Sequence, residues 1–180
     1  GDHGFVDIHT TLSPNVWLVK AGLMRAQKDR GNWKATFHTS GASAFLLLRD
    51  PSDEATARKA RQLLEALPVR YRKLFRIVDR QELDEVGADP HAAFALAPVP
   101  GVNMSSSPSG SALKPASGGT HGFFPDFKEI ETGLVAWGAG IAQQKQLPTI
   151  GLEDIAPLVA HLLQLDFQPK HGVLYPGIVK

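Results

Sequence analysis

The stretch Ser43–Pro68, "SAFLLLRDPSDEATARKARQLLEALP", carries the clearest secondary-structure pattern in this chain. Its first part is a continuous apolar run that predicts a buried strand over Ala44–Arg49, because the run is too short for a typical helix. Its second part predicts a helix over Pro51–Leu67, capped by Asp50, because apolar residues recur at helical spacing between two prolines. A strand followed by a helix indicates an α/β protein.

The residues after this helix repeat the pattern on a smaller scale. "LFRIVD" alternates and predicts a strand over Leu74–Val78, and "DRQELDEVG" predicts a short helix capped by Asp79. "HAAFALAPVPG" predicts a third strand over Phe94–Ala97, ended by its prolines. We therefore interpret residues 44–100 as a small α+β lobe inserted into a larger core formed by residues 1–43 and 101–180.

The flanking segments supply that core. "TLSPNVWLVKAGLM" predicts a helix over Pro14–Ala21 with Ser13 as its cap. The Ser-, Gly- and Pro-rich stretch Gly101–Gly119 predicts a mobile surface loop or a crossing between subdomains. "IETGLVAWGAGI" predicts a buried strand over Gly133–Trp137, and "GLEDIAPLVAHLLQLD" predicts a closing helix over Ile155–Leu165 that begins after Asp154.

Composition narrows the class of protein. The chain has 180 residues, of which 43% are hydrophobic and 21% charged, a profile typical of a globular protein with one core. A net charge of +1 gives no indication of a nucleic-acid partner, and no apolar run reaches the roughly 18 residues expected of a membrane span. The absence of cysteine excludes disulfides, thiolate metal sites and cysteine nucleophiles. It leaves the compartment, cytoplasmic or extracytoplasmic, undecided.

Two of the 7 histidines stand in glycine-bounded turns, His3 in "GDHGF" and His121 in "GGTHGFFP". Glycines allow tight turns from which a side chain can project at a ligand. Asp2 beside His3 offers a carboxylate and an imidazole, ligands typical of zinc where no sulfur is present. One interpretation is a shared metal site, and the other is two unrelated structural turns. The remaining histidines are typical of exposed or hydrogen-bonded imidazoles: His9, His38, His91, His161 and His171.

The order of these motifs resembles a known family. "DHGF", a short helix ending "KAGLM", "GGTHGFFPDFKEIETGLVAWGAGI" and "LEDIAPLVAHLLQLDF" together resemble the C-terminal half of the type I phosphodiesterase/nucleotide pyrophosphatase branch of the alkaline phosphatase superfamily. The resemblance covers nearly the whole chain, and Gln164 departs from it by standing where many members have glycine. It implies a layered α/β core, alkaline phosphatase-like but partial, and a small-molecule phosphate ester as the substrate.

The resemblance also implies a binuclear metal site. Members use two divalent metals, usually zinc, with the DHG aspartate and histidine on one ion and the THG histidine on the other, which here are Asp2, His3 and His121. The Thr or Ser nucleophile and the remaining ligands precede DHG in the family order, so this chain contains no catalytic nucleophile. We therefore expect a piece of a larger phosphodiester or pyrophosphate hydrolase that is inactive alone and prone to self-association through the surface that the missing half would cover.

Two expectations concern where side chains lie in the folded chain. The imidazoles of His3 and His121 should lie well within about 15 Å of each other, since paired metals are about 3.5–4 Å apart. Phe123 and Phe124, beside His121, could line a substrate pocket, although a local hydrophobic staple is the favoured interpretation.

The alternatives in function are a non-catalytic α+β binding module with DHG and THG as structural turns, or a phosphonate hydrolase of the same superfamily.

Overall fold

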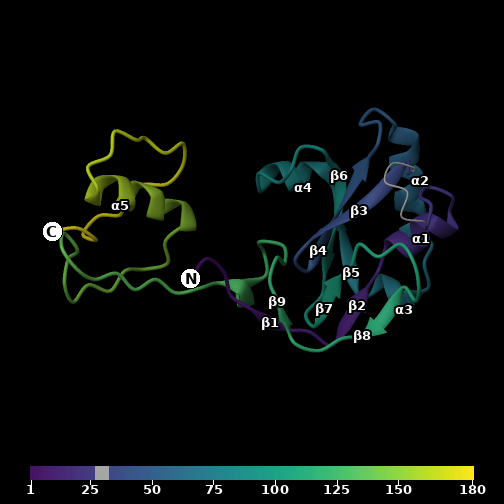
Figure 1. Ribbon diagram of the computed structural model, residues 1–180, viewed down its shortest axis with the longest axis horizontal. Helices are drawn as coiled ribbons and strands as arrows, with labels where there is room; N and C mark the ends of the chain where they lie inside the picture. The colour runs from purple at the N-terminus through teal and green to yellow at the C-terminus, as the bar shows by residue number, and fades with distance from the viewer. Residues whose placement is uncertain (27–32) are drawn as a thin grey trace. The chain divides into compact units, whose positions relative to one another are not determined.

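The computed structural model describes residues 1–26 and 33–180. The chain forms two compact units, which are described separately (Figure 1). The large unit is His3–Glu131, and the small unit is Gly1–Asp2 together with Thr132–Lys180. The fold is mixed α/β, as the sequence predicts.

The large unit is built on a four-stranded antiparallel sheet of order β3–β4–β6–β5. Its strands are β3 Ala35–Ser40, β4 Ser43–Leu48, β6 Ala92–Pro98 and β5 Phe75–Val78. The three strands predicted within residues 44–100 are confirmed. Strand β3, "ATFHTS", was not expected, because its apolar residues are too few to give a pattern by themselves. The sheet therefore joins the predicted lobe to β3 outside it, and the division into an inserted lobe and a core stays a prediction.

Three helices connect these strands: α2 Glu54–Glu65, α3 Val69–Arg72 and α4 Arg80–Glu85. Helix α2 begins later than predicted, because its cap is Asp53 instead of Asp50. The Asp53 carboxylate accepts hydrogen bonds from the amide and the hydroxyl of Thr56. The predicted cap Asp79 is confirmed, because its carboxylate accepts the amide of Glu82.

A three-stranded sheet of order β7–β2–β8 lies in the same unit. Strand β2 Thr10–Leu12 pairs in parallel with β7 Val102–Met104 and antiparallel with β8 Leu113–Pro115. The expectation of a mobile loop over Gly101–Gly119 is wrong for these residues. Strands β7 and β8 both lie within Gly101–Gly119, and each pairs with one edge of β2. This stretch therefore makes backbone hydrogen bonds that its polar composition does not reveal.

Helix α1 Asn15–Lys20 packs into the main core of the large unit. Ser13 makes no capping hydrogen bond, contrary to expectation, and Pro14 occupies the cap position. The buried side chain of Asn15 donates to the carbonyls of Phe37 and Ser106 and accepts the amide of Phe37. A buried polar group whose hydrogen bonds are all made fixes β3 against α1.

The small unit contains the 3-10 turn η2 Leu152–Asp154 and helix α5 Ile155–Leu162 around a core of Ile141, Leu158 and Ile178. The predicted strand over Gly133–Trp137 is wrong, since these residues pair with no strand among the residues described. Helix α5 ends before the predicted Leu165, because Gln164 adopts a positive φ of 53°.

Asp154 acts differently from the predicted side-chain cap. Its carboxylate accepts the amides of Gly151 and Val173, which ties the start of α5 to the segment after it. Within the described part of the chain, none of the helices is both long and apolar enough to cross a membrane.

Candidate functional site

A short antiparallel pair brings the two glycine-bounded turns together. Strand β1 Val6–Asp7 pairs with β9 Gly119–Thr120, with Val6 opposite Thr120. Because the strands run in opposite directions, the residues before β1 and the residue after β9 leave the pair at the same end. His3 and His121 therefore meet although they lie near opposite ends of the large unit's sequence. The expected proximity is confirmed, and it arises from a short antiparallel ladder.

The imidazoles of His3 and His121, called the imidazole pair below, stack on each other. Their ring centroids are 4.1 Å apart and their planes differ by 8°. Phe5 lies beside both, with its ring centroid 5.5 Å from that of His3 and 5.6 Å from that of His121. Its side chain is 64% exposed, so the pair has a solvent-accessible aromatic neighbour that the sequence interpretation did not single out.

The stacked arrangement restricts how the imidazole pair can bind metal. Nδ1 of His3 lies 3.0 Å from the carbonyl oxygen of Gly4. A carbonyl only accepts, so Nδ1 carries the proton and the lone pair of the neutral ring is on Nε2. Imidazole lone pairs lie in the ring plane, so two parallel stacked rings do not converge on one ion. The distance of 4.1 Å between the ring centroids is close to the separation of about 3.5–4 Å between paired metals.

Each histidine is followed by a glycine at which the backbone of another segment approaches closely. A Cβ at Gly4 would lie 2.9 Å from the carbonyl oxygen of Glu131, and a Cβ at Gly122 would lie 2.6 Å from that of Ser40. Gly122 also has a φ of +73°, which favours glycine. The glycine of each HG dipeptide is therefore required by packing, which is the property expected of a structural turn as well as of a ligand loop.

The turn between β3 and β4 holds the backbone of His121. The amide of Ala42 donates to the carbonyl of His121 at 2.7 Å, and the amide of Ser43 donates to the carbonyl of Gly122 at 3.1 Å. Gly41, at a φ of +59°, makes this approach possible, because a Cβ there would collide with the carbonyl oxygen of His121. The position of His121 thus depends on a hairpin that is distant in sequence.

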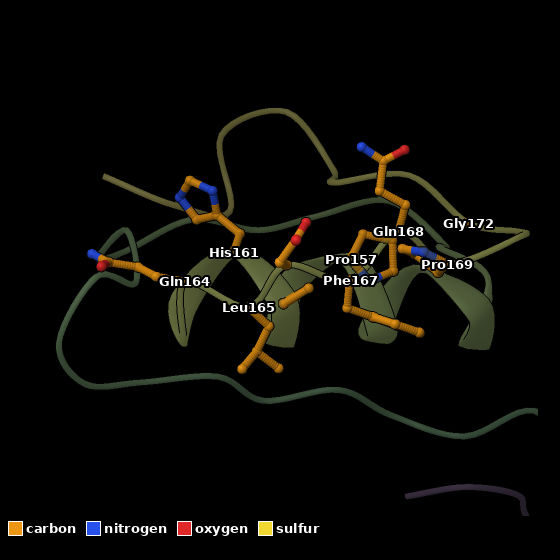
Figure 2. Close-up of a pocket in the computed structure, with 10 residues that line it drawn as sticks. Pro157, His161, Gln164, Leu165, Phe167, Gln168, Pro169 and Gly172 are labelled. Atoms are coloured by element: carbon orange, nitrogen blue, oxygen red, sulfur yellow. The ribbon is translucent and has the colours of Figure 1, made fainter.

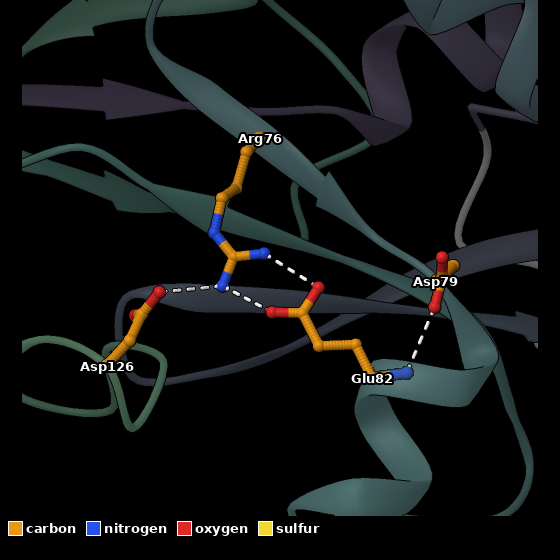
Figure 3. A network of polar contacts seen from close by, with 4 residues as sticks. All are labelled: Arg76, Asp79, Glu82 and Asp126. Carbon is orange, nitrogen blue, oxygen red and sulfur yellow. Dashed lines mark hydrogen bonds and ion pairs between the residues drawn. The ribbon is translucent and has the colours of Figure 1, made fainter.

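An ionic network fixes the residues that follow His121 (Figure 3). The guanidinium of Arg76, on β5, lies 2.7 Å from the carboxylate of Glu82 and 2.8 Å from that of Asp126. It also lies 4.6 Å from the ring centroid of Phe124. The hydrogen bond to Glu82, followed by that to Asp126, raises the pKa of Arg76. These contacts tie residues 124–126 to the sheet and to α4.

Phe123 and Phe124 are packing side chains in this structure. They are 5% and 8% exposed, and Phe123 stacks on Phe127 with ring centroids 4.4 Å apart. Their contact with substrate stays a prediction. Phe5 is the exposed aromatic residue at the imidazole pair, and its place in "GDHGF" was the signal that could have identified it.

The ligand set for a metal is incomplete. Across residues 1–26 and 33–180, no three or more His, Asp or Glu side chains are grouped so as to hold a metal ion. Asp2 belongs to the small unit, whereas His3 and His121 belong to the large one. The structure brings the two histidines together, and the metal role of Asp2, His3 and His121 stays a prediction.

The small unit has an open pocket of about 780 Å³ on α5 and the residues after it (Figure 2). His161 and Asp166 are its titratable lining residues, among prolines, glutamines and apolar side chains such as Leu165 and Phe167. All of its lining residues belong to the small unit.

No family model matches this sequence, and no curated protein matches it. Among solved structures, human ectonucleotide pyrophosphatase/phosphodiesterase 5 is similar, with a TM-score of 0.65 and 15% sequence identity over 96% of this chain. The match covers 41% of that protein's chain, so this chain spans less than half of its length. The likeness shows a fold related to that of a phosphoester hydrolase and supports the resemblance drawn from the motifs at the level of fold.

Proposed function

We propose that this chain is the C-terminal half of a metal-dependent phosphoester hydrolase acting on phosphodiester or pyrophosphate bonds. In this proposal Asp2 and His3 bind one divalent ion, and His121 binds the other. The observation that carries it is the stacking of the two imidazoles at 4.1 Å, a spacing suited to two ions and unsuited to one. The name of the similar solved protein, a nucleotide pyrophosphatase/phosphodiesterase, supports the class of reaction.

The residues of this chain would position the ligands. The carbonyl of Gly4 holds His3 in the tautomer that leaves Nε2 as the donor atom, as metal-binding histidines require. The β3–β4 turn holds His121 through its carbonyl. Two bound zinc ions would stabilise the charge that develops on the phosphoryl oxygens and lower the pKa of the attacking hydroxyl. Phe5 gives the organic part of an ester an apolar surface beside the pair.

Isothermal titration with Zn²⁺ tests the ligand assignment on the chain itself. We expect weak binding, because three ligands shared by two ions leave most of each coordination shell to water. His3→Ala and His121→Ala should each reduce the binding, and His91→Ala, an exposed histidine in the same unit, should leave it unchanged. Equal binding by all four proteins would contradict the assignment.

Hydrolysis tests the proposal on the longer protein that the proposal implies. Turnover of a chromogenic phosphodiester should fall by about 100-fold or more in His3→Ala and in His121→Ala. The 180-residue chain should show no turnover, because it contains no nucleophile of the expected kind. Faster turnover of a phosphonate monoester would favour the phosphonate hydrolase instead.

The alternative, a binding module with structural HG turns, is favoured by the close backbone approaches at Gly4 and Gly122. It predicts that neither histidine substitution affects Zn²⁺ binding or hydrolysis by the longer protein. The two experiments above therefore separate the alternatives.

A further inference from the structure

We propose that the open pocket on α5 is a binding site for a neutral saccharide, either a monosaccharide or the end unit of an oligosaccharide. All the residues that line it lie between Pro157 and Gly172, in the small unit. The proposal is independent of the proposed function, because the imidazole pair belongs to the large unit.

The pocket lies along one face of α5 (Figure 2). Pro157, Ala160 and His161 are spaced by three and four residues, so they share a face of the helix. Leu158 lies on another face, in the core of the small unit. The short side chains of Pro157 and Ala160 leave room between the helix and the residues that follow it. The resulting volume of about 780 Å³ is within the range of about 300–1,000 Å³ typical of small-molecule sites.

Residues 165–172, called the return loop below, form the opposite wall of the pocket, and both ends of this loop are held. At its start, the amide of Leu165 donates to the carbonyl of Ala160 at 2.9 Å. At its end, Gly172 has a φ of +84° and packs against the backbone of η2, where a Cβ would collide. The next amide, that of Val173, donates to the carboxylate of Asp154 at 2.8 Å. A wall held in place before binding reduces the entropy lost when a ligand is bound.

Four polar side chains line the pocket: His161, Gln164, Asp166 and Gln168. Within the part of the chain that the structure describes, none of these four side chains is hydrogen-bonded to another protein group. Amides and a neutral imidazole both donate and accept, and a carboxylate accepts. Sugar hydroxyls also donate and accept, so they match this set of groups. They would replace water at these side chains without leaving a donor or an acceptor unpaired.

The same pocket has apolar walls. Phe167 and Leu165 line it and are 54% and 51% exposed, and two prolines, Pro157 and Pro169, line it as well. The face of an aromatic ring carries partial negative charge. The C–H groups on one face of a pyranose ring carry partial positive charge, so they pack favourably on such a ring. A pocket with both polar and apolar walls therefore fits a sugar ring, which has hydroxyls at its edge and C–H groups on its faces.

The charge of the lining separates a neutral sugar from a phosphorylated ligand. Among the described residues that line the pocket there is one carboxylate, Asp166, and there is no lysine or arginine. A phosphate or carboxylate on the ligand would therefore meet a like charge with no fixed cation to offset it. This lining disfavours nucleotides and sugar phosphates, and we assign the pocket to an uncharged saccharide.

Titration of the ¹⁵N-labelled 180-residue chain with methyl glycosides tests the site. The probes are methyl β-glucopyranoside, methyl β-galactopyranoside and methyl α-mannopyranoside. We expect at least one of them to shift the amide resonances of residues 164–169 with a Kd of about 1–10 mM, because an open pocket buries only part of so small a ligand. Amides of the large unit should not shift. Glucose 6-phosphate should bind more weakly than the neutral glycosides.

Three results of this titration would overturn the proposal. The first is the absence of shifts with all three glycosides at about 50 mM, well above the expected Kd. The second is an equal response to glycerol, which has hydroxyls but no ring to pack on Phe167. The third is tighter binding of glucose 6-phosphate, which would identify an anion site instead.

Variants of the lining test the assigned contacts. Gln168→Ala should weaken binding of the glycoside by about 5-fold, because it removes a side chain that pairs with hydroxyls. Gln143→Ala, at an exposed glutamine of the same unit outside the pocket, is the matched control and should leave the Kd unchanged. Phe167→Leu should weaken binding by about 3-fold, and Phe167→Trp should preserve it, because tryptophan keeps an aromatic face. An unchanged Kd in both Gln168→Ala and Phe167→Leu would contradict the proposal.

Discussion

The large and small units differ in how far their large apolar side chains are buried. In the large unit Leu12, Leu18, Phe37, Leu46 and Leu96 are completely buried. The small unit buries Ile141, Leu158 and Ile178 and leaves many large apolar side chains in solvent. Among the residues that the structure describes, twelve large apolar side chains are exposed, and nine of them lie within residues 132–180: Leu134, Val135, Trp137, Leu152, Val159, Leu163, Leu165, Phe167 and Val173. The large unit buries its apolar residues in extensive cores, whereas the small unit has a small core and most of the exposed large apolar side chains.

This difference separates two sources of stability. Apolar burial is the main favourable contribution to folding, at about 25 cal/mol per Å². The large unit obtains it from its own strands and helices. In the small unit the same residue types contribute little until another surface covers them, and units of about 50 residues are marginal in any case. Substitutions in the two units should therefore have unequal effects in this chain.

Cavity-forming substitutions test this comparison, and among the predictions they have the largest expected effect on the free energy of unfolding. Leu46→Ala removes a completely buried side chain from the large unit and should lower its free energy of unfolding by about 3 kcal/mol. Leu158→Ala, in the core of the small unit, should lower the free energy of unfolding of that unit by about 1 kcal/mol or less. The cost is smaller because neighbouring side chains can move into the cavity. Urea unfolding followed by circular dichroism measures both. Equal losses would show that the small unit is as well packed as the large one.

Glycine substitutions test how the large unit holds the imidazole pair. Gly122→Ala should cost about 2 kcal/mol or more, because a positive φ is combined with a collision with Ser40. Gly87→Ala has a similar φ of +66° with no atom near its Cβ and should cost about 1 kcal/mol. Proton NMR contacts between His3 and His121 should weaken in the first variant and persist in the second. Preserved contacts in both would mean that the turn does not position His121.

The end of α5 offers a stabilising change in the small unit. Gln164 stands at a φ of 53°, a conformation that glycine adopts more readily. Gln164→Gly should stabilise the unit by about 0.5–1 kcal/mol, whereas Gln143→Gly, at a residue without a positive φ, should not stabilise it. Thermal unfolding followed at 222 nm compares them. A destabilised Gln164→Gly variant would contradict the described helix end.

The smallest expected effect is the pH dependence of stability that comes from Asp53, the cap of α2. Hydrogen bonds from the hydroxyl and then the amide of Thr56 lower the pKa of Asp53 below 3.8. The folded carboxylate therefore stabilises the helix above about pH 4, and this contribution is lost as pH falls through its lowered pKa. Asp53→Asn should be slightly less stable at neutral pH and should approach the wild type in acid. A constant difference between the two across this range would exclude ionisation as the cause.

The parts of the fold that sequence predicted correctly have local signals. β4, β5, β6, α2 and α4 are marked by apolar spacing, prolines and capping carboxylates within the segment itself. The two-residue strands β1 and β9 have no such signal, since each exists only through its partner at the other end of the large unit. The predicted strand Gly133–Trp137 has the local signal and lacks the partner. Pattern alone indicates what a segment can form, and pairing decides whether it forms.

The candidate site follows the same rule. His3 and His121 were identified from their glycine-bounded turns and from the order of motifs, which are properties of the sequence. Arg76 was missed, because its bridge from β5 to Asp126 exists only in the folded unit. Phe5 was missed although its place in "GDHGF" was a signal for it, since its exposure beside the pair is visible only in the structure. The assignment of Asp2 rests on the motif alone.

The metal content of the longer protein that the proposal implies tests the central claim most directly. After reconstitution with zinc and removal of excess metal, elemental analysis should find about two ions per polypeptide, the number expected of a paired site. His121→Ala should retain about one ion, His91→Ala about two, and the 180-residue chain less than one. Two ions retained in both His3→Ala and His121→Ala, or none in the unaltered protein, would contradict the assignment of the imidazole pair to a binuclear site.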